Sequence, residues 1–199
     1  SFNGTIEKPE SLGHSVGEYW SFRHDDQFLL LDTGPVGPDS LPAHGHCDLL
    51  SLEASLFGRR IFVDSGVYGY ADDPMRHYCR STAAHNVLEL DGTNQCDVWS
   101  RFRMGYPSLP DGLETGTIGD FFWAASSHNA YRRIGVPIVG RRLACRPHGP
   151  WICIDWAEGQ GSHQLTNRLH LHPGVVAKQV ASHEIHLTVS EMVLRLSFL

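Results

Sequence analysis

The sequence predicts an all-β protein, a large antiparallel two-sheet β-sandwich of the jelly-roll or supersandwich-like kind. Two observations lead to this fold class. Short runs rich in Val, Ile, Leu and aromatic residues recur between Gly, Pro, Asn and Asp, which is typical of strands joined by turns. No window of about 11 residues keeps the apolar spacing of a helix without Gly or Pro. A parallel, doubly wound fold is therefore disfavoured.

The expected strands follow one another along the chain as apolar runs bounded by turn residues. The first two read YWSFR and QFLLLD, and the turn-rich loop GPVGPDSLP follows them. Residues 1–17 resemble a linker or connecting loop, and residues 105–119 resemble a long loop of the kind that often carries binding residues. In order, strands are expected at residues 19–23, 27–32, 49–57, 60–64, 87–91, 121–126, 139–146, 151–156, 165–172, 184–189 and 192–198.

Composition limits the possible functions. The chain has 199 residues, of which 41% are hydrophobic and 19% charged, so it can bury the core of one folded domain. The net charge of −6 argues against a nucleic-acid binder, which needs a clustered basic surface. The apolar runs are far shorter than the roughly 20 residues that span a bilayer. We therefore expect neither nucleic acid nor a membrane as a partner.

The five cysteines include no CxxC pair. An odd number without such a pair indicates neither a disulfide framework nor a zinc ribbon. Cys145 and Cys153 flank the turn-like segment RPHGP, so they could face each other across a hairpin if their Cα atoms lie about 4.4–6.8 Å apart.

The densest polar cluster is PAHGHCD, residues 42–48. If this segment is extended, alternate residues share a face, so His44, His46 and Asp48 point one way and Cys47 points the other. Two neighbouring imidazoles suit a metal site, or one metal ligand beside one acid or base. The alternative is a pair of surface histidines near a strand end.

Two further segments add candidate metal ligands. Asp64 ends the apolar run RRIFVD, and a buried carboxylate must be hydrogen-bonded, paired or metal-bound; alternatively it only initiates the following Ser-Gly turn. His85 enters another apolar run in RSTAAHNVLELDG. A histidine, a carboxylate and a second histidine from three segments could form a three-ligand zinc site with an open fourth position.

These segments resemble a known family. HGHCDLLSLEASLFGRRIFVDSGVYGY followed by RSTAAHNVLELDG is similar to the heparinase II/III-like family, whose usual run reads HGHAD, VDSG and RSTxxHN. The resemblance covers roughly residues 18–175 and implies that residues 18–199 form that family's C-terminal β-sandwich domain. It also implies one structural zinc ion bound by His46, Asp64 and His85. Cys47 replaces a residue that is commonly alanine, and we do not count it as a ligand.

The resemblance further implies a polysaccharide lyase that cleaves uronic-acid polymers by β-elimination. His44 would be the catalytic residue, and Tyr70, Arg80 and Asn86 are candidate substrate-binding residues because they lie nearby in sequence. Their alternatives are a packed aromatic for Tyr70, an ion pair with Asp72 or Asp73 for Arg80, and a turn cap for Asn86.

The family's active site lies between this domain and an N-terminal α/α toroid. Residues 1–17 are too few to form that toroid, so the chain alone is expected to be inactive. A periplasmic, cell-envelope or secreted location is implied by the resemblance alone.

Two rival functions remain open. Cupin enzymes also place two histidines on a strand, but they need a glutamate four or five residues later, where this chain has Leu50 and Ser51. The other rival is a carbohydrate-binding or purely structural sandwich whose zinc only holds loops together.

Overall fold

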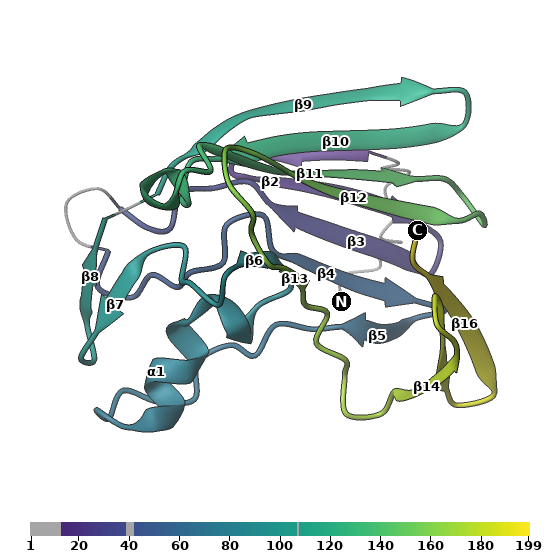
Figure 1. The fold of residues 1–199 in the computed structure, drawn as a ribbon. Coiled ribbons are helices and arrows are strands. Elements are labelled where there is room, and N and C mark those ends of the chain that lie inside the picture. The colour runs from purple at the N-terminus through teal and green to yellow at the C-terminus, as the bar shows by residue number, and fades with distance from the viewer. Residues whose placement is uncertain (1–12, 39–41, 107) are drawn as a thin grey trace, which may run out of the picture.

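The computed structural model describes residues 13–38, 42–106 and 108–199, and it confirms the all-β prediction. Two antiparallel sheets make up most of the molecule (Figure 1). One sheet has the order β1-β2-β3-β4-β5 and the other the order β12-β11-β10-β9. The bounds are β1 (Gly13–Val16), β2 (Tyr19–His24), β3 (Gln27–Asp32), β4 (Leu52–Leu56), β5 (Arg59–Phe62), β9 (Pro110–Ile118), β10 (Phe121–His128), β11 (Ile138–Cys145) and β12 (Trp151–Glu158).

The main core lies between these two sheets. Every second residue of β3 is buried, including Leu29 and Leu31, and so are Trp20 and Phe22 on one face of β2. These side chains pack with Leu143 and with other residues of β4, β10 and β11. Strand alternation therefore gives each sheet one apolar face, and burying the two faces against each other stabilises the sandwich.

Smaller elements extend from the sandwich, with α1 and the β7–β8 hairpin at one end and β14–β16 at the other (Figure 1). The three-stranded sheet β14-β15-β16 packs its Leu187 and Val189 on Ile61 of β5. The bounds are α1 (Pro74–Arg80), the short 3₁₀ helices η1 (Thr82–Ala84) and η2 (Arg132–Ile134), β6 (Leu88–Leu90), β7 (Asp97–Trp99), β8 (Arg103–Gly105), β13 (Leu165–Asn167), β14 (Val176–Ala181), β15 (Glu184–Val189) and β16 (Met192–Ser197).

All eleven expected runs contain a strand, and the structure adds others at sheet edges. The prediction of a loop at residues 105–119 is wrong, because Pro110–Ile118 forms strand β9 with the sequence PDGLETGTI. This strand lies at the edge of its sheet, where proline and glycine are tolerated, and a bulge interrupts its pairing with β10. The added strand β14 is also an edge strand, and all its residues are exposed.

The segment expected to be a linker is partly a strand. Gly13–Val16 forms β1, which pairs with β2, and the first twelve residues lie outside the described part of the chain.

Cys145 and Cys153 do not pair. In the β11–β12 hairpin Cys145 lies opposite Trp151, whereas Cys153 lies opposite Leu143. The two cysteines are therefore offset by two residues, and both are free thiols. Among the described residues, no helix is long and apolar enough to cross a membrane.

Candidate metal centre and the surface beside it

The histidine-rich segment at residues 42–48 is an irregular loop between β3 and β4 rather than the extended chain that we expected. Tertiary hydrogen bonds fix its path. The backbone N–H of Cys47 donates to the carbonyl of Arg80 at 3.0 Å, and the buried side chain of Gln95 pairs with both backbone groups of Leu49 at 2.8 and 3.2 Å. The prediction that residues 44–48 form an extended chain with His44, His46 and Asp48 on one face is therefore wrong.

The loop nevertheless brings His46 and Asp48 together with His85, which follows η1. One ligand atom from each of these residues lies within 4.8 Å of the other two, and the rings of His46 and His85 are 5.3 Å apart. His46 is 8% exposed and His85 is 0% exposed. The structure thus forms a buried group of two imidazoles and a carboxylate, and it includes Asp48, which the sequence analysis did not count as a ligand.

Asp64, in the segment after β5, bonds His85 but is not one of the three residues whose ligand atoms lie within 4.8 Å of one another. Its Oδ2 lies 2.6 Å from Nδ1 of His85, and its Oδ1 accepts a hydrogen bond from the backbone N–H of Gly66 at 2.7 Å. The Nε2 atom of His85 is buried and has no hydrogen-bond partner. A histidine that bonds a carboxylate through one nitrogen and keeps the other free matches the usual state of a metal-binding histidine.

Burial and neighbouring charges set the protonation states in this group. Burial, assisted by the charges of His85 and Arg76, lowers the pKa of His46 to about 4, so its imidazole is neutral at pH 7 and able to bind a metal. Burial also raises the pKa of Asp48 to about 7. Removal from water opposes the charges of both Asp64 and His85, but their hydrogen bond and mutual attraction lower the pKa of Asp64 and raise that of His85.

This donor set fits a divalent zinc ion. It offers two imidazoles and the half-buried carboxylate of Asp48, and a cation would offset the cost of keeping that carboxylate charged. The buried Nε2 atom of His85, which has no hydrogen-bond partner, is the feature that most directly favours a role as a metal ligand.

His44 lies on the exposed side of the same loop. Its ring is 5.6 Å from Tyr70 in an edge-to-face arrangement and 5.5 Å from Phe102. Tyr70 and Phe102 are stacked at 5.8 Å, and the guanidinium of Arg76 lies 5.3 Å from the Tyr70 ring. We call His44, Tyr70 and Phe102 the aromatic surface, and it is open to solvent because Tyr70 and Phe102 are 53% and 39% exposed.

Tyr70 was predicted to lie near His44, whereas Phe102 and Arg76 were not predicted from the sequence. Phe102 lies in the turn between β7 and β8, and the signal that could have identified it is an aromatic residue between two arginines in the polar run SRFR. Arg76 lies in α1, and its burial depends on tertiary packing that no local pattern reveals.

Arg80 is buried rather than exposed beside His44. It is 1% exposed, and it donates to the carbonyls of Gly45 at 3.2 Å and Ser100 at 3.1 Å. It therefore holds the loop between the two histidines in place. A role in binding substrate stays a prediction, and the burial of this side chain argues against it.

Asn86 is also fully buried. Its amide donates to the carbonyls of Leu52 at 2.8 Å and Val63 at 3.1 Å, and its Oδ1 accepts from the backbone N–H of His170. These bonds link the strand β4, the segment after β5 and the segment after β13. Its role in substrate binding also stays a prediction without support from its position.

A sequence model of a known protein family matches nearly the whole chain. The sequence model of the family described as heparinase II/III-like, C-terminal, matches residues 8–196. No curated protein sequence matches the chain.

Two solved structures have a similar fold. A mutant of the heparan sulfate lyase HepC from Pedobacter heparinus superposes with a TM-score of 0.72 at 19% identity, covering 92% of this chain and 28% of that one. A structure described as the heparinase III-BT4657 gene product superposes with a TM-score of 0.69 at 17% identity, covering 89% and 27% of the two chains. The chain thus spans little more than a quarter of either protein.

Proposed function

Because the chain belongs to the heparinase II/III-like family and matches its C-terminal domain, we propose that it is the metal-binding part of a lyase that cleaves uronic-acid polysaccharides by β-elimination. The substrate class is supported by the heparan sulfate lyase among the similar structures. An N-terminal helical domain would supply the rest of the active site. A periplasmic or cell-surface location is part of the proposal, since such polymers occur outside the cytoplasm.

β-Elimination imposes clear chemical demands. A base removes the proton on the carbon next to the carboxylate, the electron pair forms a carbon–carbon double bond, and the bond to the 4-linked oxygen breaks. That proton is barely acidic while the neighbouring carboxylate is fully charged, so the enzyme must neutralise or hydrogen-bond the carboxylate in the transition state. An acid must then protonate the leaving oxygen.

The observation that carries the proposal is that two histidines of one loop face different surroundings. His46 turns inward to the buried donor group, whereas His44 is exposed on the aromatic surface. An exposed imidazole can act as the base or hydrogen-bond the substrate carboxylate. The adjacent Tyr70 and Phe102 rings offer apolar faces on which a sugar ring can stack.

The metal part of the proposal is one zinc ion held by His46, His85 and Asp48, whereas Asp64, the carboxylate ligand that the resemblance implied, would orient His85 through Nδ1. When bound, the ion would cross-link the segments of His46 and His85 and so fix the loop that carries His44. The residues of this chain then orient His44, while Arg80 holds the backbone of Gly45 between the two histidines.

The test compares two variants of the complete protein. We expect His44→Ala to lower the formation of unsaturated product, followed by its ultraviolet absorbance, by about 10²–10⁴-fold with zinc content unchanged. We expect His46→Ala to lower zinc content and thermal stability. His183→Ala, which changes an exposed histidine remote in sequence from the loop, serves as the control for both measurements.

The rival function is a carbohydrate-binding or structural zinc sandwich without a catalytic group. It predicts that His44→Ala leaves lyase activity of the complete protein unchanged. The isolated chain is expected to be inactive under either function, so formation of unsaturated oligosaccharides by the chain alone would contradict the proposed two-domain active site.

A further inference from the structure

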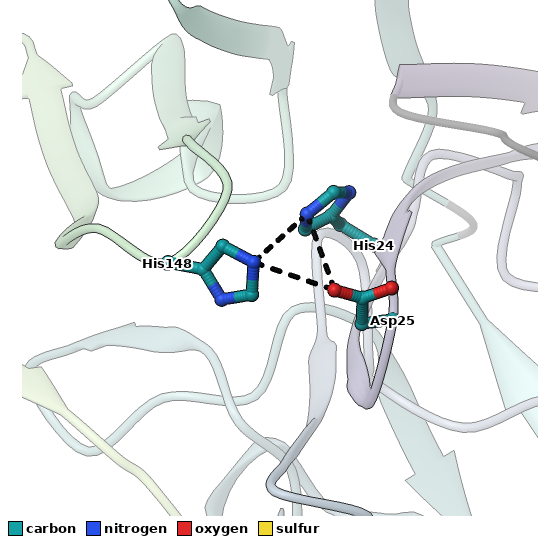
Figure 2. A group of neighbouring side chains, drawn as sticks. All are labelled: His24, Asp25 and His148. Atoms are coloured by element: carbon teal, nitrogen blue, oxygen red, sulfur yellow. Dashed lines mark hydrogen bonds and ion pairs between the residues drawn. The ribbon is translucent and has the colours of Figure 1, made fainter.

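A second group of two histidines and an aspartate lies where two turns meet (Figure 2). His24 ends β2, Asp25 lies in the β2–β3 turn, and His148 lies in the β11–β12 turn. The two turns belong to different sheets of the sandwich. We call His24, Asp25 and His148 the turn cluster, and none of them is among the candidate metal-binding, catalytic or substrate-binding residues that the sequence analysis singled out.

The three side chains converge through one atom each. Nε2 of His24 lies 3.1 Å from Nε2 of His148. Oδ2 of Asp25 lies 3.5 Å from Nε2 of His24 and 3.3 Å from Nε2 of His148. The atoms therefore form a nearly equilateral triangle, and Figure 2 shows both rings and the carboxylate turned toward its centre.

These distances match the face of a zinc tetrahedron. With zinc–ligand bonds of about 2.0–2.1 Å, tetrahedral geometry separates neighbouring ligand atoms by about 3.3–3.4 Å. An ion placed slightly to one side of the triangle would reach all three atoms. From this geometry we propose that the turn cluster is a second metal site, which binds Zn²⁺ or a similar transition-metal ion.

Hydrogen bonding alone satisfies the triangle poorly. Two protonated imidazoles would place two N–H groups against each other at 3.1 Å, so at most one Nε2 carries a proton. One proton cannot serve the second Nε2 and the carboxylate oxygen equally. A single cation satisfies all three lone pairs, and the two imidazole ligands favour zinc over the oxygen-preferring calcium and magnesium.

The protein holds the two turns together without a metal. The backbone N–H of His148 donates to Oε1 of Gln27 at 3.2 Å, and Gln27 is only 6% exposed. Asp25 and His148 both adopt left-handed backbone conformations, with φ of 49° and 50°, which aspartate tolerates better than most residues and which fix the direction of each side chain.

The site would work as a link between the two sheets. The side chains of Asp25 and His148 are 66% and 67% exposed, so the fourth coordination position faces solvent and would hold water. Binding to the folded chain alone would stabilise it, because the unfolded chain cannot keep ligands 124 residues apart in this geometry.

The experiment measures zinc binding by the complete protein after chelation and dialysis, using elemental analysis and calorimetric titration with ZnCl₂. We expect His148→Ala to bind about one zinc ion fewer per chain than the unchanged protein, and His24→Ala to do the same. At the turn cluster the affinity should fall more than about 10-fold, since even the loss of an outer-shell partner has an effect of that size. His183→Ala is the matched control on another exposed histidine, and far-ultraviolet circular dichroism checks the fold of each variant.

The readout is a difference between variants, so it is independent of the buried site and of the proposed lyase activity. A second difference adds to it: zinc should raise the melting temperature of His46→Ala, in which the turn cluster is intact, but not that of His46→Ala/His148→Ala. Equal zinc content in the unchanged protein and in both single variants of the turn cluster would overturn the proposal.

Discussion

Among the residues that the structure describes, two groups each combine two histidines and an aspartate, one largely buried and one exposed. The buried group consists of His46, Asp48 and His85, and the turn cluster is the exposed group. Their donor atoms are of the same kind. In the buried group, burial lowers the pKa of His46 to about 4 and raises that of Asp48 to about 7, whereas in the turn cluster the side chains of Asp25 and His148 are 66% and 67% exposed. The same residue types therefore have different surroundings in the two places.

The two groups also differ in how they are tied to the fold. Around the buried group, Asn86 and Arg80 bond to backbone carbonyls of separate segments. At the turn cluster the two turns are linked by the bond from the backbone of His148 to Gln27 and by contacts among the side chains of the cluster itself. The comparison indicates that changes beside the buried group should alter stability, whereas changes at the turn cluster should alter metal binding with little effect on the fold.

The largest effect on stability is expected from replacing Arg141, which bonds the backbone close to the buried group. Its guanidinium is 1% exposed, pairs with Asp155 at 2.7 and 2.9 Å, and also bonds the carbonyls of Leu50 and Asn86. We expect Arg141→Met to lower the free energy of unfolding by about 3–5 kcal/mol, because it leaves the buried Asp155 carboxylate without its charged partner. Urea unfolding measures this change.

Arg146, in the turn that carries His148, provides the matched control. Its pair with Asp120 has a separation of 3.5 Å, with side chains 40% and 67% exposed. We expect Arg146→Met to change the free energy of unfolding by less than about 1 kcal/mol. Equal losses in the free energy of unfolding of Arg141→Met and Arg146→Met would contradict the expected difference between the surroundings of the buried group and those of the turn cluster.

An intermediate effect is expected from pH through His128. Burial, with the charge of Arg141, lowers the pKa of His128 from 6.5 to about 3. Between pH 6.5 and about pH 3, the unfolded chain therefore binds a proton at His128 that the folded chain does not bind. The stability that neutral His128 contributes above pH 6.5 is lost as the pH falls through this range. We expect a slope of up to about 1.4 kcal/mol per pH unit from this residue.

The measurement is the free energy of unfolding from pH 7 down to pH 4 in the unchanged protein and in His128→Gln. The variant should have a shallower pH dependence, whereas His183→Ala, at an exposed position, should keep the original one. A slope that is identical in all three proteins would show that burial of His128 does not govern acid stability.

The smallest effect on the free energy of unfolding is expected at the exposed turn cluster. In metal-free protein, we expect His148→Ala to change the free energy of unfolding by less than about 0.5 kcal/mol, as is usual for exposed positions. Urea unfolding in the presence of a chelator measures this. A loss above about 1 kcal/mol would mean that the imidazole itself, rather than a bound ion, holds the turns together.

Local patterns predicted most of the sandwich, but they failed where neighbours outweigh local preference. Strands with regular alternation, such as β3 and β15, were found within their observed bounds. β9 was missed because its Pro, Asp and Gly residues indicate a loop, and only its pairing with β10 makes it a strand. The helix α1 was missed because its seven residues are fewer than a periodic pattern requires.

The sequence by itself determined the apolar alternation of the two sheets, the family, and the residue types from which the buried site is built. These depend on spacing along one chain segment, which strand geometry and motif patterns convert directly into structure. Only the tertiary structure decided that His44 and His46 face different surroundings, that Arg80 and Asn86 are buried, and that His24 meets His148. Each of these depends on loops whose paths are set by hydrogen bonds to distant segments, such as the bond from Cys47 to Arg80, and no local pattern encodes such partners.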